Sequence, residues 1–405
     1  MSKYVFYALY IALLLCNLIY SNFMLVGPLT YRHVIAMLLL LYLVLDKGSS
    51  LKMDKYFSVF MVYVLFWGIS SVTTGYIDSY LSKFFGTTLI AYTVYQSTKL
   101  LITKYDAFHV LIIVLLTIGL VDSAVTILQF FNNPLGYMIP GLMRVDFIEE
   151  YEGFAMRKFD AGNSSIVIPG IIGGALHGYL SSCLAVLALY PFNGKIRIVN
   201  ILLWVVFFIS LFFVQERSSL LLGFLGSIYV YYYSTKNNHM NSNSRWMNVV
   251  LSVVIIYVIY KIVIFATTTG TRYTDLGVDD GGRSIYIDNA LNYLAGNLLG
   301  GYFEYSATGA MPPHNLFINA LLWGGVFGGS VLIVMLLRQI WQAVKVLITE
   351  MKYLPAQCVF FGMLFLVYTG NSLLHNESVV TGSSTPWLYW AMFITYYEKY
   401  KYKSI

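Results

Sequence analysis

Residues 312–329 read PPHNLFINALLWGGVFGG, in which two prolines, a histidine and an asparagine directly precede a long apolar run. Proline is favoured in the first turn of a helix, so Pro312 and Pro313 predict a helix start. The apolar run continues to about residue 337, and a membrane-spanning helix needs about 20 mostly apolar residues. The stretch therefore predicts a transmembrane helix over 313–337 with polar residues where it begins.

The rest of the 405-residue chain has the same apolar character. Apolar residues make up 58% of it and charged residues 11%, whereas about a quarter of the residues in soluble domains are charged. We therefore predict an integral membrane protein in which residues 1–405 form a single membrane domain. The first apolar segment is too long for the core of a signal peptide, so we expect it to be retained as a helix. The three cysteines lie in apolar runs and form no CxxC pattern.

About twelve segments are long and apolar enough to cross a bilayer. The predicted fold class is therefore an all-α polytopic membrane protein with about twelve transmembrane helices. The predicted spans are 4–26, 28–45, 56–75, 80–98, 107–131, 166–190, 197–214, 217–234, 247–266, 313–337, 354–372 and 384–398.

The distribution of cations predicts the orientation. Lysines concentrate in one set of loops and in the C-terminal EKYKYKSI, which by the positive-inside rule places both termini in the cytoplasm. The opposite loops carry most of the carboxylates, and their cations are mainly arginine. Arginine presents a planar fork that binds phosphate oxygens in pairs, so an anionic ligand is expected on the outer side. Pairing with the many carboxylates there is the alternative. The outer arginines are Arg32, Arg144, Arg157, Arg217, Arg272 and Arg283.

Two outer loops are long, at 132–165 and 267–312, and long loops often form lids or binding segments. In the second loop Ile287, Leu291, Leu294 and Leu298 recur at helical spacing. They predict a short amphipathic helix on the membrane surface.

Glycines recur at four-residue spacing in two segments. Small residues at this spacing let helices approach closely in lipid, so we interpret them as packing positions. They are Gly170, Gly174 and Gly178 in the first segment, and the pairs Gly324–Gly328 and Gly325–Gly329 in the second.

Three polar positions are candidates for chemistry. His314 stands near a helix N-terminus, where the dipole disfavours imidazolium, so it is suited to be a general base; the alternative is an interfacial histidine that packs and hydrogen-bonds. Arg217 follows Glu216 between two apolar runs and is a functional candidate, unless the two residues pair with each other in a tight turn. Arg283 could hold a phosphate at the start of a helix, unless it pairs with nearby aspartates.

Asp122 and His177 are ionisable residues inside predicted spans. Such residues usually face the interior of the helix bundle. We interpret both as hydrogen-bonding groups between helices; the alternative is that Asp122 helps to form a cavity and that His177 is catalytic.

The segments ERSSLL, GGRSIYIDNAL and HNLFINALLWGGVFG follow one another in that order. This order resembles the O-antigen polymerase and O-antigen ligase superfamily of bacterial envelope glycosyltransferases. Arg217 followed by leucine at its fourth position looks like the first short motif of that family. His314, Asn315, Gly325 and Gly328 look like the second. The resemblance covers the topology of nearly the whole chain, but motifs only from about 215 to 330.

The resemblance implies a GT-C-like fold in the bacterial inner membrane, with the loops 132–165 and 267–312 in the periplasm. It implies a glycan carried on undecaprenyl diphosphate as substrate, and glycosyl transfer without a metal, a cofactor or a nucleotide sugar. His314 would be the catalytic base, and Arg217 and Arg283 would bind the diphosphate. Further substrate contacts are expected from Asn315, Arg144, Arg157, Arg272 and Tyr302.

The resemblance leaves two activities open. A polymerase transfers the growing glycan to a new lipid-linked repeat unit, and a ligase transfers it to lipid A-core. We favour the polymerase, because the chain is rich in Tyr and Phe and its second long loop is fairly short. A flippase for lipid-linked oligosaccharides is a competing class, but it would need charges along a path at the midplane. Besides the bilayer and the lipid-linked glycan, a chain-length regulator and a flippase are candidate partners, and no nucleic acid is expected.

Overall fold

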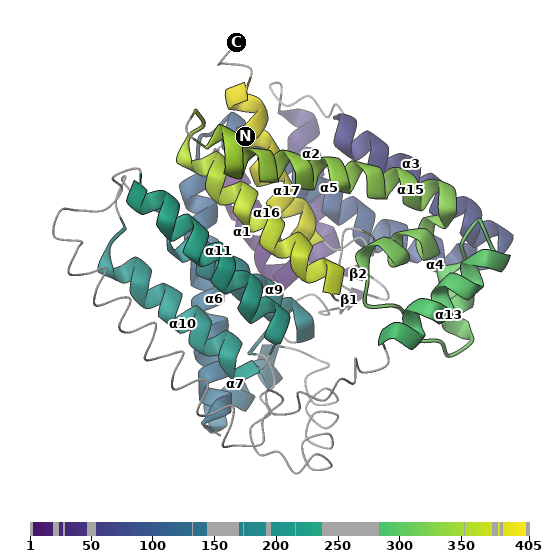
Figure 1. The fold of residues 1–405 in the computed structure, drawn as a ribbon, viewed down its shortest axis with the longest axis horizontal. Coiled ribbons are helices and arrows are strands. Elements are labelled where there is room, and N and C mark those ends of the chain that lie inside the picture. The colour runs from purple at the N-terminus through teal and green to yellow at the C-terminus, as the bar shows by residue number, and fades with distance from the viewer. Residues whose placement is uncertain are drawn as a thin grey trace. The chain divides into compact units, whose positions relative to one another are not determined.

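The described residues of the computed structural model are 3–18, 24–26, 29–46, 54–131, 133–143, 170–172, 174–191, 196–214, 216–236, 283–351, 353–374, 380 and 384–401. They are helical apart from connecting turns and a short antiparallel hairpin, in which β1 (Met24–Val26) pairs with β2 (Leu29–Thr30). Their contacts divide the chain into two compact units (Figure 1). The first comprises Met1–Val110 and Asp279–Ile405, and the second comprises Leu111–Val278.

The first unit holds most of the helices that the structure describes. A π-helical turn, η1 (Phe84–Thr88), joins α4 to α5, and a second one, η3 (Val346–Glu350), extends α15. The helices are α1 (Lys3–Leu18), α2 (Tyr31–Leu45), α3 (Lys55–Thr73), α4 (Ile77–Lys83), α5 (Leu89–Thr103), α13 (Arg283–Gly296), α14 (Tyr302–Ala307), α15 (Leu316–Lys345), α16 (Ala356–Leu374) and α17 (Ser384–Lys401).

The second unit is built around α9. Every residue from Tyr179 to Tyr190 is buried, and α9 packs against both α10 and α11. Its helices are α6 (Phe108–Phe130), whose first turn belongs to the first unit, α7 (Pro134–Met143), α9 (Gly174–Ala188), α10 (Ile198–Val214) and α11 (Arg217–Lys236).

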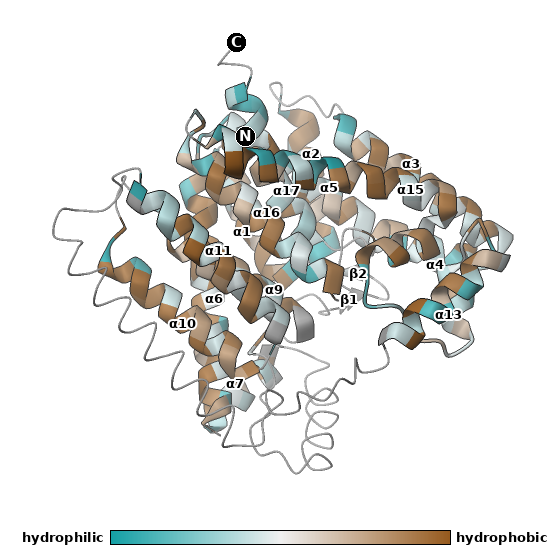
Figure 2. Ribbon diagram, viewed as in Figure 1, coloured by the Kyte–Doolittle hydropathy of each residue, from teal (hydrophilic) through white to brown (hydrophobic). Residues whose placement is uncertain are grey.

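Four of the described helices are long and apolar enough to cross a membrane: Lys55–Thr73, Phe108–Phe130, Leu316–Glu350 and Ala356–Leu374. Several shorter apolar helices accompany them. Figure 2 shows apolar residues along most of α10, for example. These helices are those of a membrane protein, as the composition predicts.

Every predicted span contains a described helix except 247–266, which lies outside the described residues. The first helix ends at Leu18, well before the predicted end at 26, because the chain next forms the hairpin of β1 and β2. Between the strands stand Gly27 and Pro28, a pair typical of turns. The long loops also contain helices that the pattern did not predict: α7 in 132–165 and α14 in 267–312.

The helix α17 forms the centre of the first unit, since all residues from Thr385 to Tyr397 are buried. A helix that is buried on every side belongs to a core. Its tryptophans pack on aromatic residues of two other helices. The Trp387 ring lies 5.0 Å from the Phe57 ring of α3 and 5.4 Å from the Tyr95 ring of α5.

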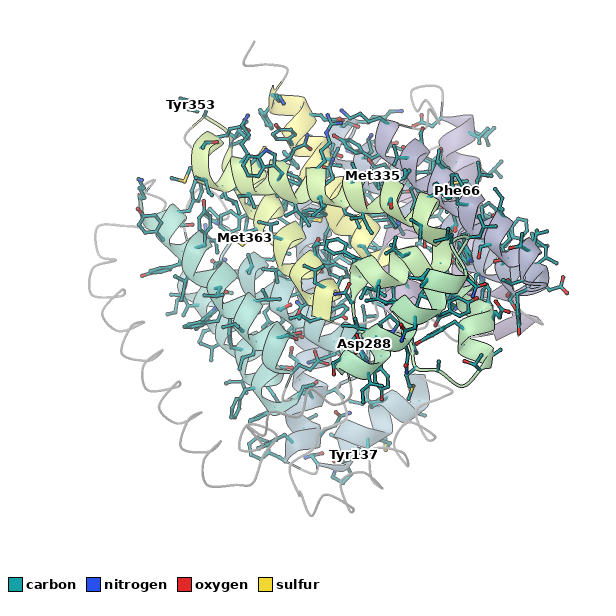
Figure 3. The ribbon with its side chains drawn as sticks, turned by 45° about the vertical axis from the view of Figure 1, so that its right-hand side comes forward. Phe66, Tyr137, Asp288, Met335, Tyr353 and Met363 are labelled. Atoms are coloured by element: carbon teal, nitrogen blue, oxygen red, sulfur yellow. The ribbon has the colours of Figure 1, made fainter. Side chains whose placement is uncertain are left out.

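The packing of α3 against α15 depends on glycines. A Cβ atom added to Gly324 would lie 2.5 Å from the Tyr63 ring, and one added to Gly328 would lie 2.4 Å from the Phe66 Cβ atom. Figure 3 labels Phe66 on α3. Real Cβ atoms do not approach other atoms this closely. The predicted role of Gly324 and Gly328 in close helix packing is therefore confirmed.

We expect Gly328→Ala to lower the stability of the protein by about 1–3 kcal/mol, because the new methyl group must push Phe66 and α3 away. The apparent Tm in detergent micelles would measure this loss. Gly296→Ala is the matched control, since a Cβ atom there meets nothing within 4 Å. Equal Tm values for the two variants would contradict the packing role.

Candidate functional site

The helix α15 is broken at Gly325. This residue has φ 69° and ψ 177°, a conformation that L side chains rarely adopt, and it separates a short helix over 316–324 from a longer one over 326–345. The turn before α14 supplies partners for the backbone groups that the break releases. The Val326 N–H donates to the Leu298 carbonyl at 2.8 Å, and the Gly301 N–H donates to the Leu322 carbonyl at 2.9 Å.

The two parts of α15 meet at a sharp angle. A Cβ atom on Gly329 would lie 2.6 Å from the carbonyl oxygen of Ala320. In a straight helix, residues this far apart in sequence are separated by about 13 Å. The predicted span 313–337 is therefore not one straight helix. The part after the break, 326–345, would still be about 30 Å long, enough for the hydrocarbon core of a bilayer.

Two asparagines fix the start of the short helix. The Asn315 side-chain oxygen accepts hydrogen bonds from the N–H groups of Phe317 (2.9 Å) and Ile318 (3.1 Å) and so caps the helix. The buried Asn319 amide donates to the Pro313 carbonyl at 2.7 Å. His314 lies between Pro313, whose carbonyl is held by Asn319, and the capping residue Asn315, and it is half-buried. It stands directly before a helix N-terminus, close to where the sequence places it.

Aromatic residues of α14 pack against the C-terminal end of the short helix. Tyr302 of α14 stacks on Trp323 with ring centroids 3.8 Å apart and an interplanar angle of 15°. One face of the Tyr302 ring is thus covered by Trp323. Phe303 meets Trp323 edge-on, with centroids 5.2 Å apart. Any sugar contact of Tyr302 would use the hydroxyl group or the other ring face.

A helix forms in the predicted segment as α13, but its packing differs from the predicted face, and its location on a membrane surface stays a prediction. Ala290 and Leu294 are buried in a cluster with Tyr305 of α14 and Leu322 of α15. Leu291 is exposed, and Leu298 lies beyond the end of the helix. The helix therefore buries a narrower stripe than the leucine spacing indicates, and it rests on α15 through that stripe.

A hydrogen bond ties α13 to α14. The Tyr293 hydroxyl donates to the Glu304 carboxylate at 2.5 Å. Burial, and then this hydrogen bond to a carboxylate, raise the pKa of Tyr293 above its usual value. The phenol therefore keeps its proton at any physiological pH.

In the second unit, Arg217 is the first residue of α11. The carboxylate of Glu216 accepts a hydrogen bond from the Ser219 hydroxyl at 3.1 Å and lies against Gly178 of α9, where no Cβ atom would fit. Glu216 therefore serves as an anchor between helices. The side chain of Arg217 lies outside the described part, so its predicted pairing with Glu216 stays open.

Asp122 and His177 bind each other inside the second unit. The His177 Nδ1 atom lies 2.5 Å from an Asp122 carboxylate oxygen, and the other oxygen accepts from the N–H groups of Ile171 (2.6 Å) and Ile172 (2.9 Å). This contact joins α6 to α9. The predicted role of both residues in bonding between helices is confirmed.

Glycine and glutamine complete the junction around Asp122. Gly170 has φ +51°, and a Cβ atom there would lie 2.2 Å from the Asp122 carboxylate. Two turns further along α6, Gln129 accepts from the Gly170 N–H at 3.1 Å and donates to the Gly170 carbonyl at 3.2 Å. The turn at 170–172 is thus hydrogen-bonded to α6 at two positions, Asp122 and Gln129.

The imidazole of His177 also contacts serine. Its Nε2 atom lies 3.0 Å from the Ser210 hydroxyl oxygen of α10. Asp122, His177 and Ser210 are therefore joined in the order found in the triads of serine hydrolases. However, Asp122 is 1% exposed and the other two are 0% exposed. The chain of bonds satisfies buried polar groups and connects three helices, and a nucleophile would need access to a substrate.

The other predicted site residues lie partly in the two units and partly in segments that the structure does not describe. Arg144, Arg157 and Arg272 lie outside the described residues. Arg283 begins α13, but its side chain is likewise not described. Arg283 and His314 belong to the first unit and Arg217 to the second, so their convergence on one pocket stays a prediction. Within the described segments, no three His, Cys, Asp or Glu residues are grouped to hold a metal ion.

The break at Gly325 was not predicted from the sequence. The signal was the doublet Gly324–Gly325 inside an apolar run, together with Gly300–Gly301 in the loop before it. Both Gly300 (φ +80°) and Gly301 (φ +147°) have conformations that favour glycine. A glycine doublet inside a membrane span is a known mark of a discontinuous helix.

Comparisons with protein-family models, curated proteins and solved structures give no match. The fold and the candidate site therefore define only a general class of protein. The chain is a helical membrane protein with a glycine-broken helix and a buried Asp–His junction.

We expect Asp122→Ala to lower the stability by about 3 kcal/mol, because it leaves His177 and two backbone N–H groups without their acceptor. Thermal unfolding in detergent would measure the change. Thr117→Ala on the exposed side of the same helix is the control and should leave the Tm within about one degree, as surface substitutions do. A small effect of Asp122→Ala would show that the junction does not hold the helices together.

Proposed function

We propose that this chain is an O-antigen polymerase, a metal-independent glycosyltransferase that extends a surface polysaccharide. The observation that carries the proposal is the order of ERSSLL, GGRSIYIDNAL and HNLFINALLWGGVFG. The proposal includes about twelve transmembrane helices in a GT-C-like arrangement, a location in the bacterial inner membrane and cytoplasmic termini. The glycosyl donor would be a glycan on undecaprenyl diphosphate, and the acceptor a new lipid-linked repeat unit.

The local geometry around His314 supports a role as base. The residue is held next to the capped N-terminus of the helix over 316–324, and Asn315 and Asn319 fix the backbone on both sides of it. The positive end of a helix dipole favours the neutral imidazole. Broken helices whose ends meet polar substrates are typical of membrane proteins that handle such substrates.

The proposed reaction is a displacement at the anomeric carbon of the donor sugar. His314 takes the proton from the attacking hydroxyl of the acceptor sugar, and a new glycosidic bond forms. The bond between the anomeric carbon and the diphosphate oxygen breaks, and undecaprenyl diphosphate leaves with the bonding electrons. Arg217 and Arg283 would stabilise the charge on the phosphate oxygens, since fixed guanidinium groups are effective where charge develops.

A reconstituted assay separates the candidate activities. Purified protein in vesicles receives lipid-linked repeat units as the sole glycan, and the products are separated by size. A ladder of longer glycans is expected. Product formed only when lipid A-core is added would assign the chain as an O-antigen ligase instead. Movement of the lipid-linked unit across the bilayer without new glycosidic bonds would assign it as a flippase.

His314→Ala should abolish glycan extension while the protein remains inserted and folded, because loss of a general base costs about 10²–10⁴-fold in rate. The length of the glycan ladder and the apparent Tm are measured together. His109→Ala, on an exposed position of α6, is the control for removing a histidine. A normal ladder from His314→Ala would remove the base assignment.

Arg217→Lys should severely reduce extension, because lysine keeps the charge but loses the planar fork that grips two phosphate oxygens. We expect a rise in the apparent KM for the lipid-linked donor together with a lower kcat. Arg197→Lys, at an exposed position before α10, tests whether arginine-to-lysine changes are harmful in general. Full activity of Arg217→Lys would argue against bidentate phosphate binding.

A further inference from the structure

An apolar groove runs along α3 and the part of α15 that follows the break. Its volume is about 430 Å³, within the range of small-ligand sites. The two helices run antiparallel here, because residues near the start of α3 face residues near the end of α15. The lining residues are Lys55, Tyr56, Val59, Ser330, Val331, Val334, Met335 and Arg338; Figure 3 labels Met335 on α15.

The walls of the groove face outward. Val334 is 66% exposed, and Ser330 and Val331 are exposed beside it. These residues lie on a helix that is apolar and long enough to span a membrane. A groove of this kind on a spanning helix is filled by something apolar, and from Ser330 to Arg338 it would extend about 12 Å along the helix axis.

Both charged lining residues stand at the same end of the groove. Lys55 is the first residue of α3, and Arg338 lies in the last third of α15. Lys55 contacts Glu398 at 3.3 Å, and its ammonium lies 4.8 Å from the centre of the Tyr56 ring. In the described part of the chain, no carboxylate is paired with Arg338, which is exposed.

The charged end has the character of a membrane–water interface. Trp341, one turn beyond Arg338, is 67% exposed, and tryptophan is enriched at this level of the bilayer. One turn further, Lys345 pairs with Glu350 at 2.9 Å. Arg338 and Lys55 therefore stand at the depth of lipid headgroups, on the side that the lysine-rich loops assign to the cytoplasm.

We propose that the groove is a binding site for one anionic phospholipid. The phosphate group lies between Arg338 and Lys55, and one acyl chain lies along Val59, Val331 and Val334. Charge complementarity selects an anionic headgroup, because two cations and a single paired carboxylate, Glu398, border this end. The site is independent of the proposed glycosyl transfer, since it uses none of the residues placed in that reaction.

The chemistry of the two cations suits the phosphate group of an anionic lipid. Cations near a bilayer surface attract anionic lipids, each by a factor of about five in binding. Lys55 can share its ammonium between Glu398 and a phosphate, because a lysine has three donors. Arg338 supplies a fork for two phosphate oxygens.

Native mass spectrometry of the purified full-length protein tests the proposal. The protein is incubated in detergent with phosphatidylglycerol or with phosphatidylcholine of identical acyl chains, and retained lipid is counted. Wild-type protein should retain phosphatidylglycerol at least about fivefold better than phosphatidylcholine. Equal retention of the two lipids would overturn the proposal.

Two variants test the headgroup contacts and the acyl groove separately. Arg338→Gln should reduce the preference for phosphatidylglycerol about fivefold, and it leaves the pair between Lys55 and Glu398 intact. Ser330→Phe keeps both cations but fills the exposed groove, and it should reduce retention of both lipids. Wild-type retention by either variant would overturn the proposal.

A matched control distinguishes the site from a general effect of charge. Lys3→Gln also removes one exposed cation near the predicted cytoplasmic side, but Lys3 does not line the groove. It should retain phosphatidylglycerol as the wild type does. An equal loss of phosphatidylglycerol retention in Lys3→Gln and Arg338→Gln would show that net charge alone attracts the lipid. It would contradict a specific binding site in the groove.

Discussion

Backbone hydrogen bonding at the break in α15 is the constraint on which the first unit depends. A helix inside a bilayer cannot leave backbone N–H or C=O groups without partners, so a break is tolerated only where other protein groups supply them. The turn over 297–301 does this through the Leu298 carbonyl and the Gly301 N–H. Because α14 follows that turn and α13 precedes it, the break also fixes where both helices pack.

The second unit meets the same constraint with side chains. Asp122 would be costly inside a helix bundle as a lone charge, but it has a histidine and two backbone N–H groups as partners. The turn at 170–172 gains a partner for its N–H groups at the same time. In both units, irregular backbone is thus stabilised where glycine permits an approach that a Cβ atom would block: at Gly170 in one and at Gly325 in the other.

Hydrophobic length was enough to predict most of the long described helices, because each is set by local composition, but α7 and α14 were not predicted. The partners of polar groups were not predictable in the same way. Asp122 and His177 were each recognised as bundle-facing, but their contact depends on how α6 and α9 pack. The break was missed because an apolar run with glycines has the same hydropathy whether it is straight or folded. The stripe on α13 was only partly predicted, since Ala290 carries burial that leucine spacing does not reveal.

The broken helix gives a structural reason for part of the second motif that resembles the O-antigen polymerase and ligase superfamily. Asn315 caps the helix over 316–324, Gly325 ends it, and Gly328 allows the next helix to approach α3. The spacing between Asn315 and Gly325 is therefore the length of one short helix, about 13 Å at 1.5 Å per residue. A protein of another activity could share these three residues for the same architectural reasons. None of these roles requires an imidazole at position 314, so the chemical part of the resemblance rests on His314 and on the arginines.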